Sequence, residues 1–308
     1  MQLLSDIGEL RGLPGQLDIA LGVFDGVHLG HAQVIGGAVA GAGTPVLVTF
    51  EPHPVRILVP DRAPKLITPL AHKARLAAGL RIEAVLAVRF DNDRAAQGAR
   101  EFIAELASAA SLGSVSVGQG FRFGRGREGD LALLTQFGIE FGFDVKGTPP
   151  VCDQGGEVIS STRVRAALEA GDLGLAERLL GRPCSVLGEV VHGALLGGKL
   201  GYPTTNVVGD AEQLPPNGVY AVRVDMGGAG GDALPGVANL GFRPTVDGAI
   251  PERPLLEVHL LDFDRDIYGR EIEVAFVEWI RDEKKFDGLE ALKAQIASDV
   301  VAARRSLA

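Results

Sequence analysis

The stretch Gly22-Val-Phe-Asp-Gly-Val-His-Leu-Gly-His31 decides the fold of the first half of the chain, because it predicts a strand that turns sharply into a helix. Residues 17–23 are apolar, as a buried parallel strand would be, and residues 31–39 can form a helix. Free backbone N–H groups at the start of that helix favour a polyphosphate, and the glycines let the backbone approach it. We therefore expect His28 and His31 to face a phosphate ligand. The alternative is that the two imidazoles merely cap a helix or pack around a loop.

Three further motifs follow this turn. Thr49-Phe-Glu-Pro-His-Pro54 comes directly after an apolar run, residues 117–130 are rich in glycine and arginine, and Ile159-Ser-Ser-Thr-Arg-Val-Arg165 precedes a helical pattern. In this order, the four motifs resemble the adenylyltransferase half of bacterial bifunctional riboflavin kinases and FAD synthetases. The resemblance implies an N-terminal, doubly wound, nucleotidylyltransferase-like α/β domain that transfers AMP from ATP to FMN.

The later motifs also have physical interpretations of their own. Hydroxyl groups before a helix can cap it while Arg163 or Arg165 reaches a phosphate, although capping alone would use the same residues. Arginines, glycines and two phenylalanines between Gly118 and Gly129 suit a flexible lid over a flat aromatic ring, but a solvated loop would look similar. The resemblance assigns catalysis to His28 and His31, flavin contacts to Phe50, Pro52, His53, Phe121 and Phe123, and ATP or phosphate contacts to Gly22, Phe24, Asp25, Gly30, Ser160, Ser161, Thr162 and Arg165.

The chain departs from this family at one position of the glycine-rich loop. The family usually has Asp or Asn where this sequence has Gly120, and that polar side chain is expected to help hold the flavin. We expect weaker or differently oriented FMN binding, with the histidine and serine motifs intact.

Composition places the chain among ordinary globular proteins that are long enough for two domains. It has 308 residues, of which 46% are hydrophobic and 22% charged. The formal charge of −9 argues against a broad nucleic-acid surface. Cys152 and Cys184 have no Cys or His neighbours at metal-ligand spacing, and no apolar run approaches the roughly 20 residues of a membrane span. With no signal peptide recognisable at the N-terminus, we expect a cytoplasmic protein with two free thiols and no membrane or nucleic-acid partner.

The pattern of the chain changes near Arg182, where a helical segment stops at Gly181 and Pro183. Strands and helices alternate before this point, and short β-rich pieces separated by Gly and Pro turns follow it. We predict domains at residues 1–182 and 183–308, the second a small antiparallel β-barrel with a C-terminal helix against it. The β-rich pieces are residues 185–191, 218–224, 255–261 and 272–276, and the apolar stripe of the helix is Leu289, Leu292, Ile296 and Val300.

A second set of motifs lies in the predicted barrel. Gly193-Ala-Leu-Leu-Gly-Gly-Lys199 nearly fits a P-loop, but Leu200 replaces the Ser or Thr that would touch Mg²⁺, so an ordinary P-loop is rejected. The longer run from His192 to Asn206 is similar to the glycine loop and Pro-Thr-x-Asn motif of riboflavin kinase. The segments 236–245 and 256–263 resemble the same kinase. The resemblance implies phosphate contacts at Gly193, Lys199 and Gly201, metal and phosphate contacts at Thr204 and Asn206, and flavin contacts at Arg281, Glu283 and Phe286.

Physical chemistry is consistent with these roles. A Thr hydroxyl and an Asn carbonyl are hard oxygen ligands suited to Mg²⁺, although a plain turn also uses such residues. Leu256, Val258 and Leu260 alternate onto one strand face and leave Glu257 on the other. By itself a strand Glu is usually solvated, but the resemblance makes Glu257 the general base that takes the proton from riboflavin.

The resemblance covers nearly the whole chain, from about residue 17 to residue 298. It implies a bifunctional enzyme that phosphorylates riboflavin with ATP to FMN and then adenylylates FMN to FAD and pyrophosphate, both with Mg²⁺. Two alternatives stay open: a riboflavin kinase whose first domain is weakened by the change at Gly120, and a non-catalytic flavin-binding protein. The sequence does not specify the oligomeric state.

Overall fold

The computed structural model describes residues 1–192, 202–227, 233–241 and 255–308. Contacts divide the chain into two compact units, Met1–Val164 and Arg165–Ala308, which are described separately below. Residues 165–182 group with the second unit, and the domain boundary expected at Arg182 stays a prediction.

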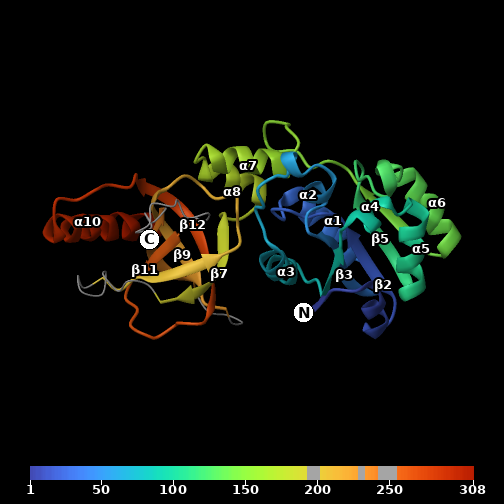
Figure 1. Ribbon diagram of the computed structural model, residues 1–308, viewed down its shortest axis with the longest axis horizontal. Coiled ribbons are helices and arrows are strands. Elements are labelled where there is room, and N and C mark those ends of the chain that lie inside the picture. The colour runs from blue at the N-terminus through green and yellow to red at the C-terminus, as the bar shows by residue number, and fades with distance from the viewer. Residues whose placement is uncertain (193–201, 228–232, 242–254) are drawn as a thin grey trace. The chain divides into compact units, whose positions relative to one another are not determined.

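The first unit is built on a parallel sheet (Figure 1). Its strands are β1 (Gln2–Leu4), β2 (Leu17–Leu21), β3 (Thr44–Glu51), β4 (Ala84–Arg89), β5 (Leu112–Gly118) and β6 (Asp144–Thr148). The connecting helices are α1 (Leu29–Val39), α2 (Pro54–Leu58), α3 (Leu70–Gly79), α4 (Asn92–Ala96), α5 (Ala99–Ala109) and α6 (Leu131–Phe141), with 3-10 turns η1 (Ile7–Gly12), η2 (Pro60–Arg62) and η3 (Arg125–Arg127). Helix α7 (Ser161–Glu169) begins at the end of this unit and continues into the second.

The strand order is β1-β4-β3-β2-β5-β6, and all neighbouring strands run parallel. From β2 the chain builds outward through β3 and β4, then returns to the other side of β2 to add β5 and β6. The order therefore reverses between β2 and β5, and open parallel sheets bind ligands beyond the carboxyl ends of strands at such a reversal. This confirms the doubly wound α/β prediction.

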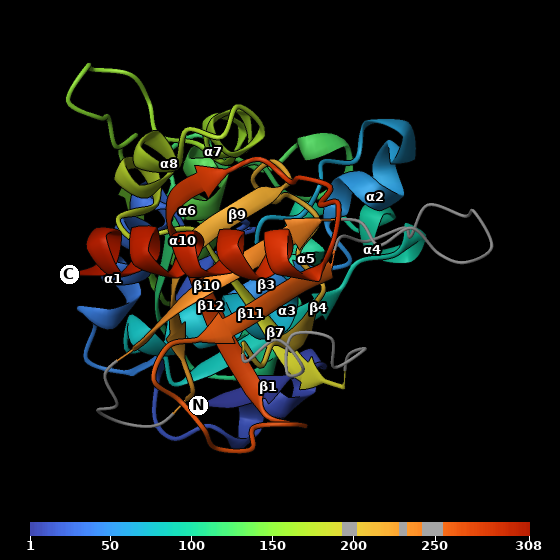
Figure 2. The ribbon, with the colours of Figure 1, turned by 90° about the vertical axis from the view of Figure 1, so that its left-hand side faces the viewer.

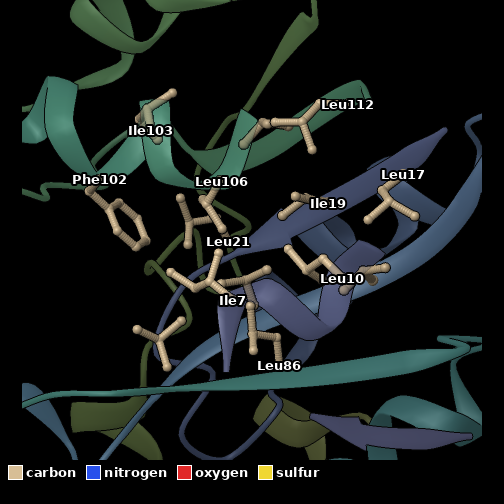
Figure 3. Packing of buried hydrophobic residues seen from close by; sticks show 14 of the residues in the cluster. Ile7, Leu10, Leu17, Ile19, Leu21, Leu86, Phe102, Ile103, Leu106 and Leu112 are labelled. Carbon is tan, nitrogen blue, oxygen red and sulfur yellow. The ribbon is translucent and has the colours of Figure 1, made fainter. Parts of the chain in front are cut away.

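Apolar side chains alternate between the two faces of the sheet. Ile19 and Leu21 of β2 pack with α5 and η1 on one face, as Figure 3 shows. Ala20 between them packs with α1 and α3 on the other face. Each face thus has its own helical layer, and the sheet is buried on both sides, as the continuous apolar run predicts.

The second unit is a closed antiparallel barrel, which confirms the second part of the fold prediction (Figure 2). Helix α8 (Leu173–Leu180) precedes it. The strands are β7 (Ser185–Val191), β8 (Thr205–Gly209), β9 (Gly218–Asp225), β10 (Leu234–Gly241), β11 (Leu255–Leu260) and β12 (Glu271–Arg281), paired in the order β10-β11-β8-β7-β12-β9.

Two of these strands, β8 and β10, were not expected from the sequence pattern. Both coincide with motif segments whose Pro, Gly and Asn residues lower intrinsic strand propensity, and pairing on both sides within the barrel overrides that preference. Strand β12 also runs five residues beyond the predicted end at Phe276. Arg281 consequently lies at the end of a barrel strand and not in a loose tail.

The C-terminal helix α10 (Leu289–Leu307) packs on β9, β10 and β12, as predicted (Figure 2). Its barrel contacts come from Val300, Ala303 and Leu307, near the C-terminal end. Leu289, predicted to be part of the buried stripe, is 59% exposed, because the helix begins beyond the edge of this apolar contact. The prediction that Leu289 packs on the barrel was therefore wrong.

Both cysteines are free, as expected. Cys152 is exposed, whereas Cys184 is buried, and burial raises the pKa of the Cys184 thiol to about 12. In the described part of the chain, no helix combines the length and the apolar character that crossing a membrane requires.

Candidate active sites

A cleft of about 500 Å³ lies where the strand order of the sheet reverses. Its walls come from the segments that follow the carboxyl ends of β2, β5 and β6. The first of these segments contains Gly22, Phe24, His28, Gly30 and His31, and the serine motif adds a further wall. Topology and motif therefore place the same residues at one ligand-sized cavity.

The two histidines lie together at the start of α1. Helix α1 begins at Leu29, two residues before the predicted start, because His28 is its N-cap: the His28 Nδ1 accepts a hydrogen bond from the His31 backbone N–H at 3.3 Å. This leaves the ring proton of neutral His28 on Nε2. The two rings stack with their centroids 3.6 Å apart, and a Cβ on Gly30 would meet the His28 ring at 3.1 Å. Capping and cleft lining are thus combined in one residue.

Asp25 connects three segments of the protein around the histidine turn. Its side chain is buried, and Oδ1 accepts hydrogen bonds from the backbone N–H groups of Ile67 (3.0 Å) and Thr68 (2.9 Å). Its backbone carbonyl accepts a hydrogen bond from the Ser161 hydroxyl at 2.7 Å. Asp25 therefore ties the histidine turn to the serine motif, and its contact with ATP stays a prediction.

The two arginines of the serine motif have different surroundings. Arg163 pairs with Asp153 at 2.5 Å and with Glu157 at 2.9 Å, so its guanidinium holds the loop before α7. The same ion pair lowers the pKa of Asp153. Arg163 is thus committed to the protein, and the phosphate contact expected of Arg165, two residues further along α7, stays a prediction. Ser160, Ser161 and Thr162 line the cleft itself.

The expected flavin contacts separate into core and cleft residues. Phe50 is 8% exposed and packs against Phe90 and Phe102 in the core, while His53 caps α2 through a hydrogen bond from the Val55 N–H to its Nδ1. In the glycine-rich loop, Phe121 lines the cleft, whereas Phe123 is buried and stacks on Phe121 with centroids 5.6 Å apart. The structure thus brings only Phe121 of these five residues, which also include Pro52, to the cleft wall.

The barrel carries two neighbouring cavities of about 290 and 310 Å³. Thr204 lines both of them, and the smaller one continues along Thr205 and residues 263–268. The larger one contains Glu257, as well as Arg281, Glu283 and Phe286. The predicted base, the predicted flavin residues and Thr204 therefore lie at two adjoining cavities, whereas Asn206, the other predicted metal ligand, is not among the residues that line either one. Gly193, Lys199 and Gly201 lie outside the described residues.

Glu257 lies in the middle of a polar row across three barrel strands. It is paired in register with Asn206 of β8 on one side and with Asn239 of β10 on the other. Directly paired residues point to the same side of a sheet, so the carboxylate and both amides share the face that borders the larger cavity.

Arg281 is held at the wall of the larger cavity by Asp299, a carboxylate of α10 with a side chain only 4% exposed. The Arg281 Nε donates to Asp299 Oδ1 at 2.9 Å and Nη2 donates to Oδ2 at 2.7 Å. The guanidinium also lies 5.7 Å from the centre of the Phe286 ring. Arg281 and Phe286 are therefore presented to the cavity in one fixed arrangement.

Comparisons with known proteins account for both halves. Residues 13–163 match the family described as FAD synthetase, and residues 180–307 match that described as riboflavin kinase. The bifunctional riboflavin kinase/FMN adenylyltransferase of Escherichia coli strain K12 is 45% identical over 99% of this chain and 97% of that protein. The chain belongs to the bifunctional riboflavin kinase/FMN adenylyltransferase family. Its relative from Pseudomonas fluorescens is 41% identical over 99% of this chain and 97% of that protein.

A solved structure supports the fold over the full length. The crystal structure of a protein named macrolide-efflux protein from Streptococcus pneumoniae matches with a TM-score of 0.79 and 29% identity, covering 99% of each chain.

Two residues of this bifunctional chain lie beside its cavities without belonging to any motif in the sequence. Asp299 is part of an ordinary amphipathic helix, and Lys73 lies near the start of α3. The sequence could have indicated these two residues only because each is a charged residue on the buried side of a helix. Such a position does not reveal which group the charge contacts.

Proposed function

We propose that the barrel phosphorylates riboflavin with ATP to give FMN, and that the sheet unit transfers AMP from a second ATP to FMN, giving FAD and pyrophosphate. The observation that carries this proposal is the convergence of each set of motif residues on its own cavity, one with paired histidines and the other with Glu257. The expected cytoplasmic location fits this reading and stays a prediction.

In the barrel, Glu257 would act on the primary hydroxyl of riboflavin. Its carboxylate accepts the hydroxyl proton as the oxygen bonds to the γ-phosphorus, and the bond to the β-phosphate oxygen breaks to release ADP. Arg281, Glu283 and Phe286 would hold the flavin in the same cavity. The proton, the new bond and the leaving group then balance within one step.

Mg²⁺ suits a donor set formed by Thr204, which lines both barrel cavities, and Asn206, which is paired with Glu257 of the neighbouring strand. The hydroxyl of Thr204 and the side-chain carbonyl of Asn206 are hard oxygen ligands, of the type that this ion prefers. When bound there, the ion would neutralise charge on the nucleotide phosphates. Asn206 is 5% exposed and lies next to Glu257, so the ligand and the base are held by adjacent strands.

In the sheet unit the nucleophile is already an anion, because it is the phosphate of FMN. An oxygen of that phosphate bonds to the α-phosphorus of ATP, and the bond to the β-phosphate oxygen breaks to release pyrophosphate. No strong base is needed, so alignment and neutralisation of charge supply the rate enhancement. His28 and His31 would provide donors for the phosphates, next to the hydroxyls of residues 160–162.

One observation favours weak FMN binding, and hence a low adenylyltransferase activity, in the sheet unit. Gly120 lines the cleft, and a Cβ placed on it would have no heavy atom within 4 Å. The polar side chain that the family usually has there is absent, yet space for it exists. Supplying FMN and ATP and measuring FAD distinguishes an active adenylyltransferase from a chain that is a kinase alone, and flavin binding without ATP consumption would favour a non-catalytic binder.

Restoring that side chain is expected to improve flavin binding. In Gly120→Asn we expect the KM for FMN in adenylylation to fall about threefold to tenfold, the range of one added hydrogen bond. Steady-state FAD formation measures the change, and riboflavin phosphorylation in the same chain, which should not change, is the control. An unchanged KM in a folded variant would show that Gly120 is not the cause of weak FMN binding.

Removing the charge behind Arg281 is expected to affect flavin binding in the barrel. In Asp299→Asn the KM for riboflavin should rise about tenfold or more, because the guanidinium loses the carboxylate that orients it. The KM for FMN in adenylylation should stay the same.

A matched control for this variant is a second ion pair between the same helix and the barrel. Arg304 forms an exposed ion pair with Asp262 at 2.7 Å, and Asp262 does not line either cavity. Asp262→Asn should leave both activities within about twofold, since exposed pairs contribute little. Equal riboflavin KM values in the two variants would contradict the role given to Asp299.

A further inference from the structure

Lys73 places a buried ammonium group directly behind the histidine turn. The residue belongs to α3 and is 4% exposed, and it is not among the residues that line the cleft. Its Nζ donates to the backbone carbonyl of Val23 at 2.8 Å and to the Thr49 hydroxyl at 3.1 Å. The Thr49 hydroxyl in turn donates to the same Val23 carbonyl at 2.9 Å. One carbonyl oxygen therefore receives two donors, one of them a cation.

A buried cation is costly, so its retention needs compensation. Burial lowers the pKa of Lys73, and the carboxylates of Asp25 and Glu51 act in the opposite direction. Both carboxylates therefore favour the charged form of Lys73. A methionine or leucine would fill this volume without the desolvation cost, which indicates that the charge itself has a use.

The turn in front of Lys73 has a backbone that needs support. Phe24 has a φ of 54° and Val27 a φ of 42°, values in the left-handed region that a β-branched residue in particular rarely adopts. Such conformations are strained and cluster at functional sites. The hydrogen bonds of Lys73 and Thr49 to Val23, and those of Ile67 and Thr68 to Asp25, hold the turn in this form.

The peptide bond between Val23 and Phe24 then has a defined direction. In a planar trans peptide the C=O and the N–H point in opposite directions, so a carbonyl that faces Lys73 directs the Phe24 N–H away from it. Phe24 is 1% exposed, and within the described residues its backbone N–H has no hydrogen-bond acceptor. Val23 and Phe24 both line the cleft, and the Phe24 ring lies edge-on to His31 with centroids 5.3 Å apart.

We propose that Lys73 is a positioning residue for adenylylation: its ammonium orients and polarises the Val23–Phe24 peptide so that the Phe24 N–H is offered to the phosphates of the nucleotide. The cation at the carbonyl end strengthens the N–H as a donor, and it does so without touching the substrate. The inference rests on the proposed adenylylation of FMN in this cleft.

The test compares Lys73→Met with Thr49→Val, in the full chain. Lys73→Met removes the charge at nearly constant volume, and kcat for FAD formation from FMN and ATP should fall about 10- to 100-fold, while the KM for FMN changes less than about twofold. Thr49→Val removes the second donor but keeps the cation, so its kcat should fall no more than about threefold. Riboflavin phosphorylation in each variant reports whether the rest of the chain is intact and should not change.

A second comparison reports on the phosphate contact itself. If the N–H binds a phosphate oxygen, replacing that oxygen by sulfur weakens the same contact that Lys73→Met removes. ATP is therefore replaced by its α-, β- or γ-phosphorothioate. For at least one of the three analogues, the rate of FAD formation should fall by a larger factor in the parent than in Lys73→Met. A purely structural role would leave the ratio of the rates with ATP and each analogue equal in the two proteins.

The outcomes separate the inference from the function on which it rests. A parent chain that makes no FAD contradicts the proposed adenylylation. If the parent makes FAD, two results would overturn only the role proposed for the Lys73 charge. The first is a kcat of Lys73→Met within about twofold of the parental value, and the second is an equal loss of kcat in Lys73→Met and Thr49→Val. If Lys73→Met does not fold, Lys73→Gln, which keeps a neutral donor, is measured in the same assays. It should show a decrease in kcat and a decrease in the phosphorothioate effect, both smaller than those expected for Lys73→Met. Parental values of both quantities would overturn the proposal.

Discussion

Replacing His28 and His31 together by alanine is expected to lower the rate of FAD formation from FMN by at least about 1,000-fold, since each preorganised donor at developing phosphate charge contributes about 100-fold or more. Riboflavin phosphorylation by the same protein should stay within about twofold of the parent, because the barrel has its own cavities. The measurement is chromatographic separation of FMN and FAD from two assays, one started with riboflavin and one with FMN.

The capping role of His28 needs a control of its own. Loss of an N-cap costs about 1 kcal/mol of stability, and Asn is among the best N-cap residues. His28→Asn keeps an acceptor for the His31 N–H but removes the imidazole, so it should remain as stable as the parent and still lose adenylylation. Parental FAD formation in His28→Asn would show that capping is the whole function of this residue. Loss of both activities in the double variant would contradict two independent sites.

Glu257→Gln is expected to show the opposite pattern. Removing the carboxylate should lower kcat for riboflavin phosphorylation by about 100- to 10,000-fold, the usual contribution of a general base, while FMN supplied directly is still converted to FAD. Glutamine keeps the size of the side chain and its place between Asn206 and Asn239.

A second strand glutamate provides the matched control for this variant. Glu189 is an exposed residue of β7 in the same barrel and does not line either cavity. Glu189→Gln should leave phosphorylation unchanged. Comparable rates in Glu257→Gln and Glu189→Gln would remove Glu257 from the reaction, and lost FAD formation from FMN in Glu257→Gln would link the two sites.

Much of the architecture could be predicted because local pattern and global fold agree. The apolar run before Gly22 is buried on both faces of a sheet, and the alternation around Glu257 is the one that a barrel strand requires. Strands β8 and β10 were not predicted because here the local pattern and the fold disagree. Their motif residues have a low strand propensity, and pairing with neighbouring strands compensates for it.

The direction in which a motif side chain points could not be predicted from the motif. Phe50 and Phe123 turn into the core, and Asp25 turns toward the backbone of Ile67 and Thr68, 42 or more positions along the chain. Arg163 pairs with Asp153, which no local pattern connects to it. Each of these orientations depends on contacts between residues that are distant in the chain, and local sequence patterns do not reveal such contacts.

Two separate nucleotide sites in this chain are expected to act in sequence on riboflavin. The most direct measurement is a time course of riboflavin with ATP and Mg²⁺, resolved for riboflavin, FMN and FAD. We predict that FMN appears first, that FAD follows as FMN accumulates, and that ADP and pyrophosphate are released in step with FMN and FAD respectively. Riboflavin that stays unmodified at saturating ATP and metal, in protein with an intact fold, would contradict the account.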